Sequence, residues 1–162
     1  DEAVRTALDK SAGKLLGKRV KRVDASNLHI TLAFAGSVSG QVRSCLETAA
    51  DDIRVPDFEL CIDRVGHWPR PRILWAGPTH IPGELWSLAG ALRQALEDCG
   101  IDTGTRPCQP HVTLARKVSK RPEGAGFPPF HWSISQFSLV ESVTDPAGVR
   151  YRVLRSWALG SV

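Results

Sequence analysis

A short segment that occurs twice constrains the fold of this chain more than any other feature. Residues 28–34 read LHITLAF and residues 110–116 read PHVTLAR. Both copies contain a histidine, a β-branched residue, a threonine, a leucine and an alanine in that order, and one copy lies in each half of the 162-residue chain. Because self-similar segments at a fixed offset indicate duplication, we expect two related halves.

Each copy has the pattern of a β-strand, because its polar residues alternate with apolar ones. Side chains point to alternate faces along a strand. His29 and Thr31 should therefore share one face, about 7 Å apart along the strand, and His111 and Thr113 should share a face in the same way. A pseudo-two-fold axis between the halves would let the two pairs face each other across a cleft.

Two imidazoles and two hydroxyls suit the cleavage of a phosphodiester. An unperturbed imidazole titrates near pH ~6.5, so one histidine can accept a proton while the other donates one. The hydroxyls can donate hydrogen bonds to phosphate oxygens. No carboxylate lies within either motif, so the pattern favours an anionic substrate over a metal cation.

The paired motifs resemble those of the two-histidine (2H) phosphoesterases, and most closely the bacterial RNA 2′,3′-cyclic phosphodiesterases, also called 2′-5′ RNA ligases. Residues 27–36 resemble the first family motif, and residues 106–107 with 110–117 resemble the second. The resemblance covers about residues 20–160 and extends to further matching positions, which are residues 73–77, Phe137, Leu139, Glu141, Ser142, Tyr151, Leu154 and residues 157–159.

This resemblance implies an α+β fold with two pseudo-symmetric lobes, each an antiparallel sheet with outer helices, and an active-site cleft between them. We expect one such domain over residues 1–162. Family members begin with an aromatic-containing strand before the first helix, whereas this chain begins with a helical pattern. The family strand is therefore expected to be absent from this chain.

The resemblance also implies roles for individual residues. His29 is expected to be the proton donor and His111 the proton acceptor, while Thr31, Thr113 and Arg116 bind the phosphate. Strict alternation would place Arg116 on the face opposite His111, unless a bulge or the end of the strand turns it inward. The expected reaction is hydrolysis of a terminal 2′,3′-cyclic phosphate to a 2′-phosphate, without metal or cofactor, and its reverse would form a 2′-5′ bond.

Three alternatives to this reaction remain open from the sequence. The chain could be an RNA-binding module with an idle site, or a hydrolase that depends on a metal. It could also act on small cyclic or 2′-5′-linked nucleotides instead of RNA ends. Hydrolysis of a cyclic-phosphate nucleotide in the presence of a chelator would separate the first two from the phosphodiesterase.

Apolar periodicity predicts the secondary structure along the chain. Helices are expected over residues 1–16, over residues 42–53 after a Ser39 cap, and over residues 85–99 before Gly100. Expected strands cover residues 58–62, 73–76, 111–118, 137–143 and 151–159, with the strand at 73–76 pairing back with the strand at 58–62. The expected connections are a turn over residues 66–71, a loop over residues 119–131 and a turn over residues 145–148.

Composition adds only broad expectations. The net charge of +4 favours anionic partners weakly, and RNA with cyclic-phosphate ends is the partner that we expect. No secretory or membrane-spanning pattern is present, so we expect a cytoplasmic monomer with four reduced cysteines. Trp68 and Trp75 could be core residues or could stack on a base. Phe34 is expected in the core, and His67, His80 and His131 at structural or surface positions.

Overall fold

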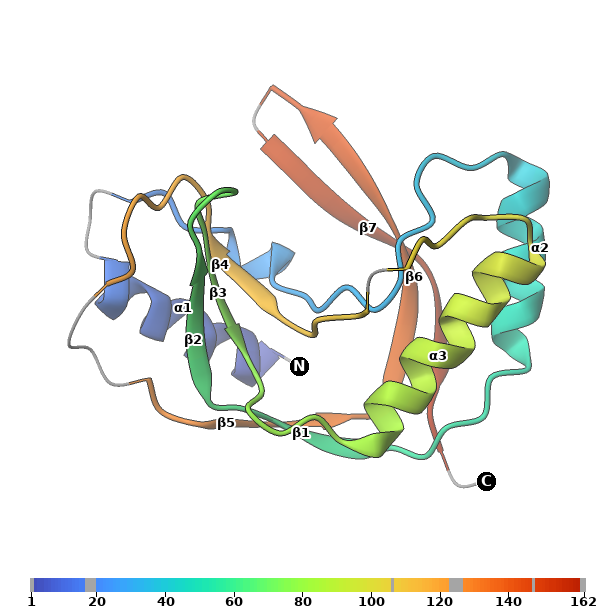
Figure 1. The fold of residues 1–162 in the computed structure, drawn as a ribbon, viewed down its shortest axis with the longest axis horizontal. Coiled ribbons are helices and arrows are strands. Elements are labelled where there is room, and N and C mark those ends of the chain that lie inside the picture. The colour runs from blue at the N-terminus through green and yellow to red at the C-terminus, as the bar shows by residue number, and fades with distance from the viewer. Residues whose placement is uncertain (1, 17–19, 106, 123–126, 147, 161–162) are drawn as a thin grey trace. The chain divides into compact units, whose positions relative to one another are not determined.

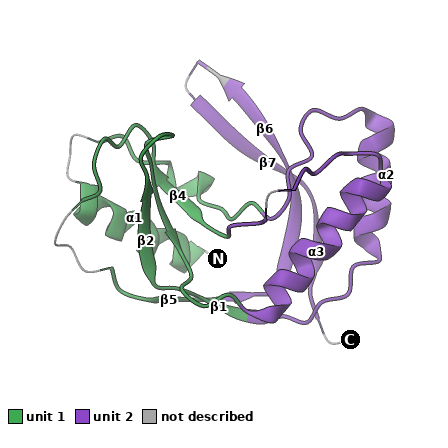
Figure 2. Cartoon of the chain, in the orientation of Figure 1, with its two compact units in different colours: residues 1–31, 59–81, 110–132 green, residues 32–58, 82–109, 133–162 purple. Residues whose placement is uncertain are grey.

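A computed structural model describes residues 2–16, 20–105, 107–122, 127–146 and 148–160 (Figure 1). Two compact units divide the chain, and each is built from three separate segments (Figure 2). Arg106 of the second family motif and Ala147 of the expected last turn lie outside the described residues. The α+β class with two lobes that the sequence predicted is confirmed by the mixture of helices and antiparallel sheets.

Unit 1 consists of Asp1–Thr31, Glu59–Ile81 and Pro110–Trp132. Its centre is an antiparallel sheet in the order β2-β3-β4, formed by Arg64–Trp68, Ile73–Gly77 and Val112–Ala115. The helix α1 (Glu2–Leu16) contacts β4 (Figure 1). The apolar side chains of this unit that are almost completely buried include Leu8, Ala12, Leu74, Ala76, Val112, Leu114 and Ala115. One face of the sheet therefore packs against the hydrophobic core, and the opposite face does not contribute these buried side chains.

Unit 2 consists of Leu32–Phe58, Pro82–Gln109 and Ser133–Val162. It contains α2 (Gly40–Asp51), α3 (Gly83–Asp98) and a hairpin of β6 (Gln136–Asp145) and β7 (Gly148–Ala158). One cluster of buried residues in its core consists of Ala50, Val55, Leu88, Phe137 and Leu159. The predicted Ser39 cap is confirmed, since its side chain accepts a hydrogen bond from the Val42 amide. Gly100 follows α3 with φ +82°, a conformation that favours glycine at a helix end.

A third sheet has two strands, β1 (Phe58–Ile62) and β5 (Phe130–Ile134). Along β1 the exposure alternates, with Leu60 and Ile62 completely buried and Glu59 exposed. The alternation predicted for residues 58–62 is confirmed. The predicted loop over residues 119–131 is wrong at its end, because β5 begins at Phe130.

Two expectations about the central sheet are wrong. Residues 66–68 belong to β2, although their glycine and the following prolines indicated a turn. β3 pairs with β2 and β4 and not with β1. Glycine in β2 has a packing reason, because a Cβ on Gly66 would lie 2.0 Å from Cζ2 of Trp75. The indole ring occupies the space that any larger residue at this position would need.

The cysteines also differ from expectation. Cys45 of α2 and Cys99 after α3 form a disulfide with their Cα atoms 5.9 Å apart, so the prediction of four reduced thiols is wrong for this pair. Cys61 and Cys108 are free thiols as expected. Burial raises the pKa of the Cys108 thiol, and it is the main cause that raises the pKa of Cys61.

Candidate active site

The second motif is part of the three-stranded sheet. His111 immediately precedes β4, which begins at Val112 and ends at Ala115, so the strand is shorter than the predicted 111–118. Val112 and Leu114 are each only 1% exposed, whereas His111 and Thr113 are partly exposed. The predicted alternation is therefore confirmed in this motif, with the apolar pair toward the core and the polar pair on the other face.

The first motif is not a regular strand, which corrects the prediction for residues 28–34. The segment joins the edge of β4 through an isolated antiparallel bridge between Ile30 and Val112. Arg22 forms a second such bridge with Ala115. The short 3₁₀ helix η1 (Ala25–Asn27) lies between these two contacts. The edge of β4 is thus covered by one interrupted segment, and Phe34 beyond it is 79% exposed and not a core residue as expected.

The bridge fixes which residues of the two motifs lie together. Directly opposed residues of an antiparallel pair point to the same face. With Ile30 opposite Val112, His29 lies opposite Thr113 and Thr31 lies opposite His111. Opposed Cβ atoms are about 4.5–5.5 Å apart and diagonal ones about 7–8 Å. This register gathers both histidines and both threonines on one face of unit 1, with the two histidines diagonal to each other.

His29 is oriented by its own turn of the chain. Its Nδ1 lies 2.7 Å from the carbonyl oxygen of Asn27. Because a carbonyl oxygen can only accept, Nδ1 carries the proton of this hydrogen bond. Nε2 is therefore the ring atom whose protonation this hydrogen bond does not fix. No sequence signal points to this interaction beyond the closeness of the two residues.

Asp24 caps the turn that carries this carbonyl. Its Oδ1 accepts hydrogen bonds from Ser26 Oγ at 2.6 Å and from the Ser26 amide at 2.9 Å. The same two bonds hold the pKa of the Asp24 carboxyl below its ordinary value of 3.8, with the side-chain bond as the larger cause. The Leu28 amide then donates to the Ala25 carbonyl at 3.2 Å and closes η1.

His111 is held instead by two indole rings. The Trp68 ring meets the imidazole edge-on with centroids 4.6 Å apart, and the Trp75 ring does so at 6.4 Å. The two indoles also contact each other at 5.3 Å. Both tryptophans thus pack around a proposed catalytic histidine, which the sequence did not predict. The Nε1 donor of Trp75 is buried and has no hydrogen-bond partner among the described residues.

A β-bulge decides the position of Arg116. Thr113 pairs with Trp75 and Ala115 pairs with Leu74, so Leu114 is an extra residue in β4. Consistent with this bulge, Leu114 and Ala115 are both buried in succession. Arg116 is the first residue after β4, and counting on from the bulge we expect it on the face of Thr113. The sequence analysis named such a bulge as one condition for Arg116 to share a face with His111. The Arg116 side chain is exposed.

The other histidines lie elsewhere in hydrogen-bonded roles or at the surface, as expected. His67 Nε2 lies 2.9 Å from the Val118 carbonyl, and His131 Nδ1 lies 2.9 Å from Glu59 Oε1. His80 is exposed. Among the described residues there is no group of three or more His, Cys, Asp or Glu side chains that could hold a metal ion. The same residues contain no helix with the length and apolarity that a membrane crossing requires.

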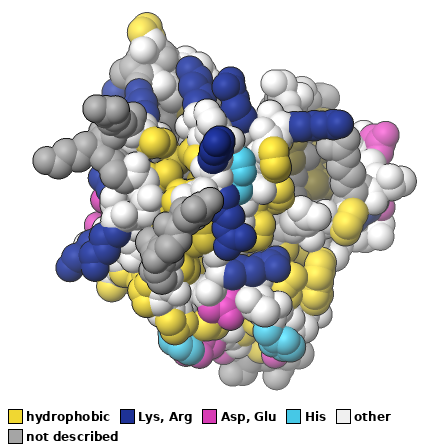
Figure 3. All heavy atoms as spheres, turned by 60° about the vertical axis from the view of Figure 1, so that its left-hand side comes forward, with side chains coloured by type: hydrophobic (Ala, Val, Ile, Leu, Met, Phe, Trp, Pro, Cys, Tyr) yellow, Lys and Arg dark blue, Asp and Glu magenta, His cyan; other side chains and the backbone are white. Residues whose placement is uncertain are grey.

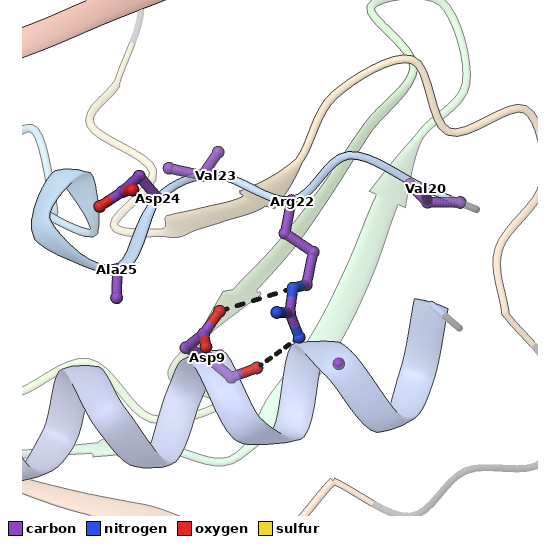
Figure 4. Close-up of a pocket in the computed structure, with 7 residues that line it drawn as sticks. Asp9, Val20, Arg22, Val23, Asp24 and Ala25 are labelled. Atoms are coloured by element: carbon purple, nitrogen blue, oxygen red, sulfur yellow. Dashed lines mark hydrogen bonds and ion pairs between the residues drawn. The ribbon is translucent and has the colours of Figure 1, made fainter. Parts of the chain in front are cut away.

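Neither motif histidine lines the pocket drawn in Figure 4. The pocket has a volume of about 580 Å³ and lies between α1 and residues 20–25. Arg22 points across it toward Asp9, with Nε 3.5 Å from Oδ1 and a second nitrogen 3.2 Å from the Asp9 carbonyl (Figure 4). Its basic group is thus already paired. Elsewhere the surface carries many Lys and Arg side chains, several of them close to a histidine in Figure 3.

Comparison with known proteins shows which family this chain resembles. The chain is 40% identical over 141 residues to the RNA 2′,3′-cyclic phosphodiesterase of Escherichia coli K12, a match that spans 85% of this chain and 78% of the relative. It is 29% identical to the protein of the same name from Archaeoglobus fulgidus, over 96% of this chain and 93% of the relative.

A solved structure of E. coli LigT complexed with 3′-AMP has a TM-score of 0.87 to this chain at 32% identity, covering 99% of this chain and 94% of that one. The apo form of LigT has the same TM-score of 0.87 at 33% identity, over 98% and 92% of the two chains. Residues 3–146 match the family described as the 2′-5′ RNA ligase superfamily. The chain therefore belongs to this superfamily of two-histidine phosphoesterases.

Proposed function

We propose that this protein is an RNA 2′,3′-cyclic phosphodiesterase that hydrolyses a terminal cyclic phosphate to a 2′-phosphate. One observation carries the proposal. The bridge between Ile30 and Val112 brings two imidazoles and two hydroxyls to one face of one unit. The names of the relatives in E. coli and A. fulgidus support the same substrate class.

In the proposed mechanism His111 accepts a proton from water, whose oxygen attacks phosphorus. The bond from phosphorus to the 3′ oxygen breaks, and His29 gives its Nε2 proton to that oxygen. Thr31, Thr113 and Arg116 donate hydrogen bonds to the non-bridging oxygens as negative charge grows on them. The protein side chains supply every proton transfer, so neither a metal nor a cofactor is needed. In the proposed ligation reaction, a 5′-hydroxyl takes the place of water: it attacks phosphorus and gives its proton to His111. The bond from phosphorus to the 3′ oxygen breaks, His29 protonates that oxygen, and the product has a 2′-5′ bond.

Hydrolysis of a nucleoside 2′,3′-cyclic phosphate in EDTA tests this proposal. The wild-type protein should turn the substrate over at an unchanged rate with chelator present. His29→Ala and His111→Ala should each lower kcat by about 10²–10⁴-fold, with substrate binding less affected. His80→Ala is the matched control, because His80 is exposed and lies outside both motifs. Product analysis should show a 2′-phosphate.

Each alternative has its own outcome in this experiment. Binding of RNA ends without turnover by the wild-type protein would indicate an idle site. Loss of activity in EDTA would indicate a metal hydrolase. A panel of RNA ends, small cyclic nucleotides and 2′-5′-linked oligonucleotides would identify the preferred substrate. Wild-type turnover in either motif-histidine variant would reject the two-histidine mechanism.

We also propose that residues 1–162 act as one catalytic domain, as a monomer, and in the cytoplasm. A single cooperative thermal transition and a monomeric mass by light scattering would support the first two points. The Cys45–Cys99 disulfide weighs against the cytoplasmic location, because disulfides are rare in reducing compartments. Recovery of the protein from an oxidising compartment on cell fractionation would contradict the cytoplasmic location.

A further inference from the structure

Arg64 lies on the same sheet face as the motif residues. In β2 it shares a face with Gly66 and Trp68, because side chains alternate. Gly66 is opposite Trp75 in β3, and Trp75 is opposite Thr113 in β4. Arg64 is therefore on the face of Thr113, two strands away from β4, which corresponds to about 10 Å.

The Trp75 ring links Arg64 to His111. The guanidinium carbon lies 5.2 Å from the Trp75 ring centroid, in a cation–π contact, and His111 lies 6.4 Å from the same ring. Two glycines let the indole lie close to the backbone between them. A Cβ on Gly66 would meet the ring at 2.0 Å, and one on Gly77 would lie 3.1 Å from ring atom Cζ3.

The charge of Arg64 is not neutralised by a carboxylate among the described residues. Other arginines are paired, such as Arg43 with Glu47 at 2.7 Å and Arg93 with Glu97 at 3.0 Å. The neighbouring carboxylate of Asp63 accepts a hydrogen bond from the Thr79 amide at 2.7 Å. Arg64 is thus an exposed cation, restrained by an aromatic ring and able to donate to an anion.

We propose that Arg64 binds an internal phosphodiester of the RNA, upstream of the terminal cyclic phosphate. The inference rests on the proposed function and specifies its substrate class. An RNA strand has a negative charge at every linkage, whereas a mononucleoside cyclic phosphate has none beyond the reacting group. Arg64 is therefore a specificity residue that favours RNA ends over mononucleotides.

A neutral linkage tests this subsite directly. The two substrates are a dinucleotide ending in a 2′,3′-cyclic phosphate, and the same dinucleotide with a methylphosphonate as its internal linkage. The wild-type protein should prefer the charged substrate by about fivefold to tenfold in kcat/KM, chiefly through KM. Arg64→Ala should reduce this preference to near one. Arg64→Lys should retain part of it, because the charge remains while the planar fork is lost.

Arg43→Ala is the matched control, since it removes an exposed arginine from α2 in unit 2, and it should keep the wild-type preference. Retention of that preference in Arg64→Ala would overturn the proposal, as would an equal loss on both substrates.

Binding of the two dinucleotide 2′-phosphates, followed by tryptophan fluorescence, separates this proposal from the proposed function. If the wild-type protein hydrolyses neither substrate, the proposed function fails. Charge preference in binding that is lost in Arg64→Ala would then still support the subsite, and equal binding of both products would overturn it.

Discussion

The two motifs share almost the same sequence but are supported by different means. The second motif lies within a sheet, where β3 pairs with β4 and two indole rings contact His111. The first motif has a single bridge to β4, and its exposed His29 is oriented by a hydrogen bond to Asn27. A duplicated sequence therefore does not imply a duplicated environment.

This difference separates the two histidines chemically. His29 has its Nδ1 proton assigned by a carbonyl acceptor, so its exposed ring presents Nε2 as a defined donor when it is cationic. His111 is bordered by apolar ring surface, which limits the access of water from that side. We propose that the two supports correspond to the two roles that the family resemblance implies, with His29 as the acid and His111 as the base.

The largest effect is expected from a substrate that needs no acid. A cyclic phosphate with sulfur at the 3′ bridging position has a thiolate leaving group, which departs without a proton because its conjugate acid has a pKa near ~8.5. His29→Ala should lose about 10²–10⁴-fold in kcat on the oxygen substrate and much less on the sulfur substrate. His111→Ala should lose activity on both. Stopped-flow measurement of thiol release gives the rates.

The opposite pattern would exchange the two roles. If sulfur restored His111→Ala and not His29→Ala, His111 would be the acid, and the different supports of the two motifs would carry no information about their roles. Equal restoration of both variants would show that the two imidazoles act interchangeably.

A smaller loss of activity is expected when the indole packing around His111 in the second motif is disturbed. In Gly66→Ala the new Cβ would lie 2.0 Å from Trp75, so the ring or β2 must move. Overpacking of this kind lowers the free energy of unfolding by about 1–3 kcal/mol. We expect this loss in urea unfolding, together with a reduced kcat, because the Trp75 ring contacts His111.

Gly90→Ala is the control for that substitution. Gly90 lies in α3, and a Cβ added to it would have nothing within 4 Å. Alanine in a helix is more favourable than glycine by about 0.5–1 kcal/mol, so this variant should be slightly more stable and fully active. Wild-type stability and activity in Gly66→Ala would show that the indole packing does not support the second motif.

The sequence predicted those parts of the fold that local patterns determine. The three helices and the hairpin of β6 and β7 follow from apolar periodicity and turn residues, and they are confirmed. The motif residues were identified from the repeat, and the bridge between Ile30 and Val112 gives the register from which we infer their shared face. Arg116 required a bulge that the sequence could only name as a condition.

The remainder depends on contacts between residues distant in sequence. Gly66 in β2 indicated a turn when only its local sequence was considered. The reason for a glycine there is the indole of Trp75, which lies on another strand and occupies the space of a side chain. The spacing of four cysteines could not reveal the Cys45–Cys99 disulfide, since helix packing brings the pair together. The first motif has strand alternation but only one bridge to β4. η1 precedes the motif, and Ile30 already pairs with Val112, where β4 begins.

The smallest effect is expected at Asp24, which caps η1 and thereby supports the first motif. Asp24→Ala removes the acceptor of both Ser26 hydrogen bonds, so the Asn27 carbonyl that orients His29 should be less restrained. We expect kcat to fall by less than in His29→Ala, with KM little changed. Asp24→Asn keeps an acceptor oxygen and should fall between Asp24→Ala and wild type. If the kcat of Asp24→Ala falls on the oxygen substrate but not on the sulfur substrate, the effect acts through His29 as the acid. An equal fall in kcat on both substrates would indicate a general structural role.

The pH dependence of this cap has a defined sign. The folded pKa of Asp24 is lowered from 3.8, chiefly by the Ser26 side chain, so the cap contributes to stability fully above the ordinary value. That contribution is lost as the pH falls through the lower folded pKa. Ser26→Ala removes the larger cause, and NMR titration of the Asp24 carboxyl should then show a pKa closer to 3.8. An unchanged titration would mean that the Ser26 hydroxyl does not hold the carboxylate, and that the Ser26 amide is the donor that lowers the pKa of Asp24.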